Sequence, residues 1–251
     1  MPLQCDILLF VVTTTEKEQL EKAAKELNIP FNRRQGNVSR YYDLGRIGDT
    51  NVMALRTEMG PLSYNGSASR AIYAMIETGA TGLVSLGMAF GIDSDSQDYG
   101  DLVVSRVLLP YDKRTVKTVA GNMQADYSDV EPHEAKPALI KMLEKEAEEP
   151  EWRQKVSFGA VLTGSAKIQC TQYRKELVTA FSEIDEPVVG GEMEGAGLLA
   201  TCERSFPSWV VVKGITDFAD ERQEQDAKES RELACHNAAR FVLQAIMKVN
   251  A

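Results

Sequence analysis

The stretch SWVVVKGITDFAD, residues 208–220, is an apolar run that passes into a polar loop. Its continuous apolar character predicts a strand buried on both faces of a sheet. Asp217 and Asp220 come where this strand would end. Ligands of α/β sheets bind beyond the carboxyl ends of the strands, so both carboxylates are candidates for a site. Either one could equally cap a turn of the loop.

Two other apolar runs end in residues that could join the same site. CDILLFVVTT, residues 5–14, leads to Glu16 and Glu18, while GLVSLGMAFGI, residues 82–92, contains Gly87 and Gly91. A glycine lets the backbone approach a ligand closely. The two glutamates could also simply complement the positive N-terminal end of the helix that follows. The residues alone leave both interpretations open.

Strands alternate with helices along the whole chain. Besides the strands above, residues 101–111 and 158–164 are short β-rich runs, and residues 40–59 read as a hairpin with its turn at 47–51. Helical spacing predicts helices within residues 16–27, 61–79, 136–155, 192–205 and 230–249. This alternation predicts one α/β domain over residues 1–251, with a central mixed sheet flanked by helices.

Composition narrows the class of protein. The net charge of −9 argues against a nucleic-acid partner, which would favour a basic face. The longest apolar run, residues 7–12, falls far short of the roughly 20 residues that span a bilayer. No signal-peptide pattern opens the chain, and the four cysteines form no CxxC pair. We therefore expect a cytoplasmic protein with no membrane partner, no metal and no organic cofactor.

The segment GGEMEGAG, residues 190–197, places two glutamates before an apolar helical run. Glu192 and Glu194 could both be first-turn acids at the positive end of a helix. Alternatively, one of the two carboxylates faces a ligand.

GGEMEGAG followed by VVVKGITDFAD, residues 210–220, resembles the paired signature of the nucleoside phosphorylase/nucleosidase superfamily. Within it, the chain looks similar to the 5′-methylthioadenosine/S-adenosylhomocysteine nucleosidases, which carry Glu-Met-Glu and then Ser/Thr-Asp-x-Ala-Asp after a hydrophobic strand. Further matches follow in order at residues 86–93, 99–105 and 161–168. The resemblance implies a nucleoside phosphorylase-like fold with a partly barrel-like sheet, and a homo-oligomer, either a dimer or a hexamer.

The resemblance also implies a reaction, the hydrolysis of the bond between ribose and a purine base, most simply adenine. By the matched motifs, Asp217 would give a proton to N7 of the leaving base. Glu194 would accept hydrogen bonds from the ribose hydroxyls, and Met193 would pack against the ribose. Glu18 would activate the attacking water, with Glu16 as the reserve after a two-residue slip. Glu192 would then be the helix-start acid.

Other segments would complete the binding site for the purine nucleoside or nucleotide. The glycine loop would contribute Gly87, Met88 and Ala89. Lys167 and Ile168 would border the adenine, with Lys167 standing where the family has an aromatic ring.

Three alternatives to this nucleosidase stay open. Phosphorylases of the superfamily bind phosphate through an arginine and a serine, for which this chain has Ser85 and Met88, so water is favoured as the acceptor. Some related domains of bacterial defence systems remove adenine from nucleotides such as AMP or ATP. For such phosphates the cationic candidates are Arg33, Arg34, Arg40, Arg114, Lys167 and Arg174. A non-catalytic nucleoside-binding protein is the third alternative.

Overall fold

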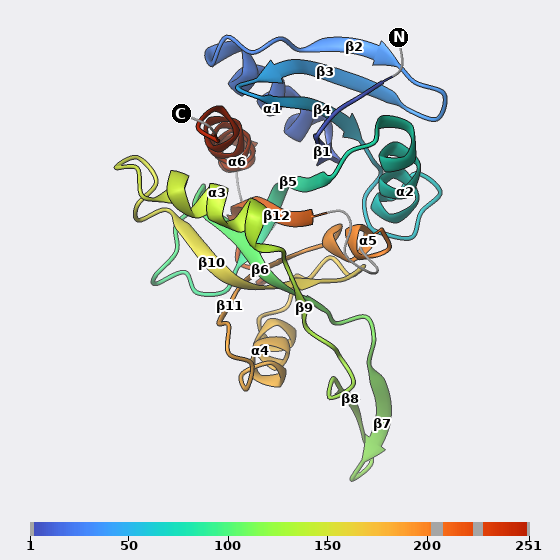
Figure 1. The fold of residues 1–251 in the computed structure, drawn as a ribbon. Coiled ribbons are helices and arrows are strands. Elements are labelled where there is room, and N and C mark those ends of the chain that lie inside the picture. Colours follow the sequence, from blue (N-terminus) through green and yellow to red (C-terminus); the bar gives the residue numbers. More distant parts are fainter. Residues whose placement is uncertain (1–2, 202–207, 223–227, 250–251) are drawn as a thin grey trace.

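The computed structural model describes residues 3–201, 208–222 and 228–249. Within these residues one large sheet forms the centre of the molecule and a separate hairpin projects from it (Figure 1). The strands are β1 Ile7–Val11, β2 Asn32–Gln35, β3 Arg40–Ile47, β4 Thr50–Arg56, β5 Gly82–Gly91, β6 Leu102–Pro110, β7 Thr115–Val119, β8 Asn122–Asp126, β9 His133–Glu134, β10 Val156–Thr163, β11 Val188–Glu192 and β12 Ser208–Asp217. The helices are α1 Thr14–Glu26, α2 Ser67–Thr78, α3 Pro137–Ala147, α4 Thr171–Ala180, α5 Gly195–Leu199 and α6 Lys228–Met247.

The large sheet is partly closed on itself. Its strands run in the order β11-β10-β6-β12-β5-β1-β4-β3-β2, with β9 beside β6, and β11 also pairs with β5. This last pairing is antiparallel, with Gly190 opposite Gly91, and it joins β5, β12, β6, β10 and β11 into a ring. The mixed, partly barrel-like sheet predicted from the sequence is therefore confirmed.

Parallel pairing gathers several strand ends at one edge. β1 pairs in parallel with β4 and β5, and β12 pairs in parallel with β5. The carboxyl ends of β1, β4, β5 and β12 consequently lie side by side, as expected for a ligand-binding edge.

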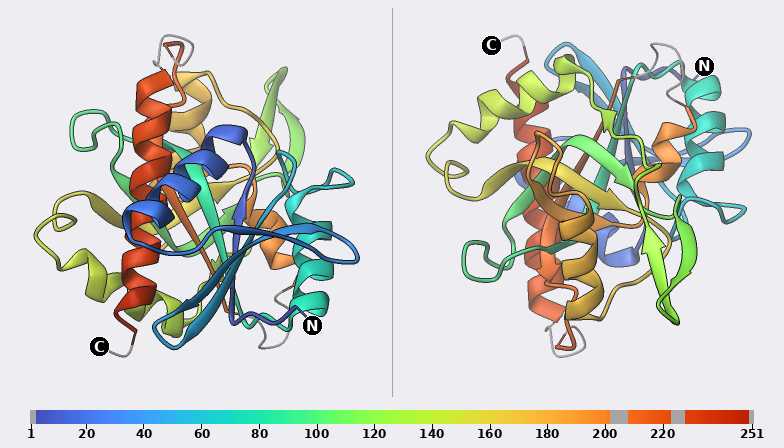
Figure 2. Two further views of the ribbon diagram at one scale, coloured as in Figure 1. Left: turned by 90° about the horizontal axis from the view of Figure 1, so that it is seen from above. Right: turned by 90° about the horizontal axis from the view of Figure 1, so that it is seen from below.

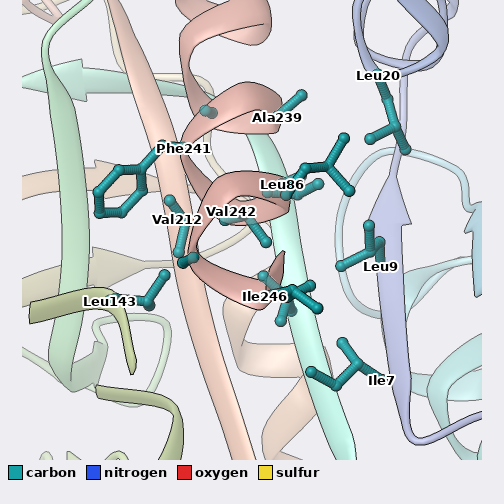
Figure 3. Packing of buried hydrophobic residues seen from close by; sticks show 14 of the residues in the cluster. Ile7, Leu9, Leu20, Leu86, Leu143, Val212, Ala239, Phe241, Val242 and Ile246 are labelled. Atoms are coloured by element: carbon teal, nitrogen blue, oxygen red, sulfur yellow. The ribbon is translucent and has the colours of Figure 1, made fainter. Parts of the chain in front are cut away.

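Helices α1 and α6 lie together on one side of the sheet and bury the largest apolar cluster (Figure 2). In this cluster, Val242 and Ile246 of α6 pack near Leu86 of β5 and Leu9 of β1 (Figure 3). Each such fully buried aliphatic side chain contributes roughly 1.5–3 kcal/mol. This packing fixes the strand ends that carry the polar residues.

Local sequence signals explain the element boundaries. Thr13 and Glu16 form a reciprocal capping box that starts α1, as the Thr/Glu pattern predicts. Gly79 ends α2 in the left-handed conformation, with φ of 71°. The predicted hairpin is present as β3 and β4.

The helix predicted over residues 192–205 is wrong at its start. Glu192 is the last residue of β11, and α5 begins only at Gly195 and ends at Leu199. Residues 202–205, with Cys202, lie outside the described part of the chain. No sequence pattern predicts α4 or the β7–β8 hairpin, and the strands of that hairpin are largely exposed and lack an apolar period.

Candidate functional site

A cavity of about 340 Å³ opens at the shared carboxyl edge of the sheet. Its volume lies within the roughly 300–1,000 Å³ that small-molecule sites occupy. Its walls come from the ends of β1, β5, β11 and β12, from the loops after β4 and β10, and from the first turns of α1 and α6. The lining residues are Val12, Thr13, Thr15, Glu16, Met59, Met88, Ala89, Phe90, Ala166, Lys167, Ile168, Gly191, Glu192, Met193, Glu194, Thr216, Asp217 and Arg231.

A buried lysine lies against two glutamates of this wall. Lys213 of β12 has no solvent exposure, and its Nζ donates to Oε2 of Glu194 at 2.7 Å. Oε2 of Glu192 is 3.6 Å from the same nitrogen. Glu192 also accepts the backbone N–H groups of Glu194 and Gly195 at 2.9 Å, which holds the turn between β11 and α5. Glu192 thus stabilises the helix start from the end of the strand.

The charges of this cluster depend on one another. Burial raises the pKa of Glu192, Lys213 lowers it and Glu194 raises it. Burial by itself would lower the pKa of Lys213, but Glu194, Glu192 and Glu16 outweigh that effect and raise it above its ordinary value. The lysine therefore supplies a fixed positive charge among three carboxyl groups.

Glu16 brings a third carboxyl group to the cavity from the first turn of α1. It is 4% exposed, and its Oε2 accepts the N–H groups of Val12 at 2.6 Å and Thr13 at 2.8 Å. Its Oε1 accepts the N–H of Met88 at 3.2 Å. Burial raises the pKa of Glu16, Lys213 lowers it and Glu194 raises it. The capping acid of the helix is thus also a wall of the cavity.

Gly87 makes room for this carboxyl group. A Cβ atom at position 87 would lie 2.0 Å from Oε1 of Glu16, and the backbone there has φ of +138°. Both the contact and the dihedral angle require glycine. Gly87 itself does not line the cavity, so its contribution is to the placement of Glu16.

Asp217 lies at an irregularity of β12. The register with β5 shifts between Ile215 and Asp217, so Thr216 is an extra residue of a bulge, a feature that re-aims side chains. Oδ1 of Asp217 accepts the N–H of Ala219 at 2.9 Å, and the Thr216 hydroxyl donates to Oδ2 at 3.0 Å. Asp217 is 8% exposed and lines the same cavity as Glu16 and Glu194.

Most residues predicted for the site are brought together. The cavity is lined by Asp217, Glu194, Met193, Met88, Ala89, Lys167 and Ile168. Glu18 is not among them, because it is exposed on the outer side of α1. The structure therefore does not bring Glu18 to the cavity, and the reserve residue Glu16 lies there instead. Glu16 and Glu18 are two residues apart on α1, so their side chains point about 200° apart around the helix axis. One is therefore buried while the other is exposed.

Most of the cationic residues predicted to bind phosphate do not line the cavity. Of the six cationic residues, Lys167 alone lines the cavity. Arg34 pairs with Asp43 at 2.8 Å, and Arg174 donates to the carbonyl of Phe218. Ser85 is buried within β5 and does not reach the cavity.

Sequence reasoning missed several lining or supporting residues. Lys213 had a signal, because a lysine inside the buried run VVVKGI must find a partner. Phe90 packs so closely that a Cβ on Gly191 would lie 2.1 Å from its ring. Thr13 carried only the capping-box pattern, and Met59 and Arg231 carried no local signal that distinguishes them from surface residues.

The described residues show no sign of a metal site, a disulfide or a membrane span. Among the described residues no cluster of side chains could hold a metal ion. Cys5 and Cys235 are buried and Cys170 is exposed, each as a free thiol. Over the same residues, no helix combines the length and apolarity needed to cross a membrane.

The partly closed sheet and the acidic cavity at its edge define an α/β enzyme of the nucleoside phosphorylase fold. The chain belongs to the phosphorylase superfamily, which matches residues 7–247.

Solved structures of similar fold cover nearly the whole chain. A 5′-methylthioadenosine/S-adenosylhomocysteine nucleosidase from Neisseria meningitidis, in complex with methylthio-immucillin-A, is 18% identical with a TM-score of 0.77, covering 97% of this chain and 99% of its own. The S-adenosylhomocysteine nucleosidase of Streptococcus pyogenes, with 5-methylthiotubericidin, is 18% identical with a TM-score of 0.78, covering 99% and 98%. Futalosine hydrolase of Helicobacter pylori is 17% identical with a TM-score of 0.76, covering 98% of each chain.

A curated relative comes from Amphimedon queenslandica and is called a death domain-containing ATP nucleosidase. It is 22% identical over 187 residues, which cover 64% of this chain. The match spans about a third, 32%, of the relative's length.

Replacing Lys213 with methionine will destabilise the fold by about 3–5 kcal/mol at neutral pH, because it leaves buried carboxylates without their cation. This loss of stability will become smaller as the pH is lowered. Burial raises the pKa of Glu192 and Glu16 and Lys213 lowers it, so loss of the lysine raises both pKa values further. The variant then takes up more protons on folding than the wild type and gains stability relative to it as pH falls. Urea unfolding at two pH values measures both effects.

Lys117→Met is the matched control, since Lys117 pairs with Asp126 at 2.6 Å on the exposed hairpin. It should cost no more than about 1 kcal/mol. Equal losses in the two variants would contradict a structural role for the buried cluster.

Proposed function

We propose that the protein hydrolyses the N-glycosidic bond of an adenine nucleoside or nucleotide and releases the free base. The observation that carries this proposal is the meeting of Glu16, Glu194 and Asp217 at one cavity of small-molecule size. The related structures named as nucleosidases and hydrolases support it. So does the relative named as an ATP nucleosidase.

Cleavage of the bond leaves an oxocarbenium-like sugar and an electron-rich base. The bonding electron pair leaves with the base, and Asp217 in its protonated form gives a proton to N7. Proton transfer of this kind contributes about 100- to 10,000-fold. Thr216 and the N–H of Ala219, each bonded to Asp217, hold the carboxyl group in place.

Glu194 accepts hydrogen bonds from the ribose hydroxyls, while Met193 packs against the sugar. Lys213 and the N–H of Gly60, bonded to opposite oxygens of Glu194, orient its carboxyl group. A carboxylate beside the ribose also stabilises positive charge that develops at C1′. Lys213 is thus a positioning residue rather than a group that touches substrate.

Glu16, as a carboxylate, takes a proton from the water that attacks C1′, which completes the exchange of base for hydroxyl. Its three backbone donors hold it on the wall formed by α1 and β5. Lys167 and Ile168, at the loop after β10, border the base. Assembly into a homo-oligomer stays a prediction of the resemblance.

Incubation with methylthioadenosine, S-adenosylhomocysteine, adenosine, inosine, AMP and ATP, with and without phosphate, tests the function directly. We expect free adenine, in amounts independent of phosphate, and Asp217→Asn should lower kcat by about 100- to 10,000-fold while substrate still binds. Free base is read by chromatography and binding by calorimetry. Product that is formed only with phosphate, as ribose 1-phosphate, would make the protein a phosphorylase instead.

Glu16→Gln and Glu18→Gln form a matched pair on one helix. The first should lower kcat/KM by about 100-fold or more, because the neutral amide cannot accept the proton of water. The second should leave kcat/KM unchanged, since Glu18 is exposed outside the cavity. Circular dichroism checks that α1 survives the loss of its capping acid. The opposite ranking would restore Glu18 to the site.

The pH profile of kcat/KM should fall on its acid side at a pH above 4.5, the ordinary pKa of a glutamate, because burial raises the pKa of Glu16. Glu16 must be ionised to act as the base, so activity is lost as pH falls through that raised pKa. Steady-state rates across the acid range measure the limb, with fluorescence as a check on folding. An acid limb at or below 4.5 would remove Glu16 from this role.

A further inference from the structure

A second hollow of about 550 Å³ lies beside the cavity, at the carboxyl ends of β1 and β4. Val12, Thr13 and Met59 line both, so a ligand in the cavity can extend a substituent past them into the second hollow. We call this hollow the arginine groove. Its lining residues are Val12, Thr13, Thr14, Arg56, Thr57, Glu58, Met59, Asn65 and Arg70.

Two guanidinium groups give the arginine groove its charge. Arg56 is exposed, and its Nε donates to the carbonyl of Val12 at 2.6 Å, while its Nη groups have no partner among the described residues. Arg70 of α2 is held in place by the Val38 carbonyl, Ser39 and Asn65. Glu58 is the one carboxylate of the described lining, so the groove keeps a net positive charge in a protein whose total is −9.

Neutral donors in the arginine groove also lack acceptors. Thr57 is 4% exposed, and its hydroxyl oxygen is buried with no hydrogen-bond partner in the described structure. Thr14 is the first residue of α1, where backbone N–H groups point away from the helix without intrahelical partners. A buried hydroxyl without a partner, together with the first N–H groups of α1 that the Thr13 cap leaves unbonded, fits an anionic ligand.

We propose that the arginine groove binds the 5′-phosphates of an adenine nucleotide whose base and ribose occupy the cavity. The proposal rests on the proposed function and narrows its substrate class to nucleoside phosphates. The planar donor fork of Arg56 matches two phosphate oxygens, and Arg70, Thr57 and the start of α1 add charge and hydrogen bonds. A thioether substituent would gain nothing from the two guanidinium groups.

Arg56→Ala tests the proposal when kcat/KM is compared for AMP, ATP, adenosine and methylthioadenosine. We expect a loss of about 10- to 100-fold for the two nucleotides and no change for the two nucleosides. Thr57→Val, which removes only the hydroxyl group, should show the same selectivity with a smaller loss. It keeps the test decisive if Arg56→Ala fails to fold. Arg46→Ala is the control, because Arg46 is exposed on β3 and pairs with Asp49 at 2.6 Å.

Calorimetry with inorganic tripolyphosphate separates this proposal from the proposed function. Binding by the wild type that is lost in Arg56→Ala supports the groove even if no glycosidic bond is cleaved. Equal losses for nucleosides and nucleotides would overturn the assignment. A loss of nucleotide turnover in an Arg231→Ala variant and not in Arg56→Ala would also overturn the assignment, because Arg231 lies at the α6 side of the cavity. Loss of a phosphate-dependent turnover of nucleosides in Arg56→Ala would instead make the groove a site for free phosphate.

Discussion

Lys213 lies without solvent exposure between Glu192 and Glu194, and its charge reaches Glu16 as well. Moving these charges out of water costs several kcal/mol for each ion, which well-placed partners only offset. Well-packed apolar residues at these positions would stabilise the fold at least as much. The cluster instead joins β12, the turn after β11 and the first turn of α1 at one point. Lys213 thus ties Glu192 and Glu194 to β12, and its charge acts on Glu16 across the same cluster.

The backbone around the cluster is adapted to it at specific positions. Gly87 leaves the space that the Glu16 carboxyl group fills, and Gly191 leaves the space for the Phe90 ring. The bulge at Thr216 turns Asp217 toward the cavity at the end of the strand that carries Lys213. Closure of the sheet by pairing of β11 with β5 then brings Glu194 opposite these residues. Strand pairing, rather than local sequence, thus sets the distance between the acids.

The sequence predicts the α/β class, the strand ends and most of the cavity wall, because buried parallel strands carry long apolar runs and their ends carry the polar residues. The sequence does not predict which of two neighbouring side chains points into the cavity. Glu16 and Glu18 share a strand end, and only the Thr13 capping box, readable as T-x-x-E, distinguishes the inward acid. Lys213 was overlooked inside its apolar run. The β7–β8 hairpin was missed because its exposed residues show no alternation.

The division of charge between the two hollows is consistent with water as the nucleophile. Glu16, Glu192 and Glu194 face one buried lysine in or behind the cavity wall, an arrangement that favours a cationic sugar and opposes an incoming phosphate dianion. Arg56 and Arg70 stand outside this region, past Thr13 and Met59. Phosphates of a substrate could therefore be held by the arginines without approaching the reacting carbon. In the proposed mechanism, the same separation would let a negatively charged substrate bind beside carboxylates that stabilise positive charge on the sugar.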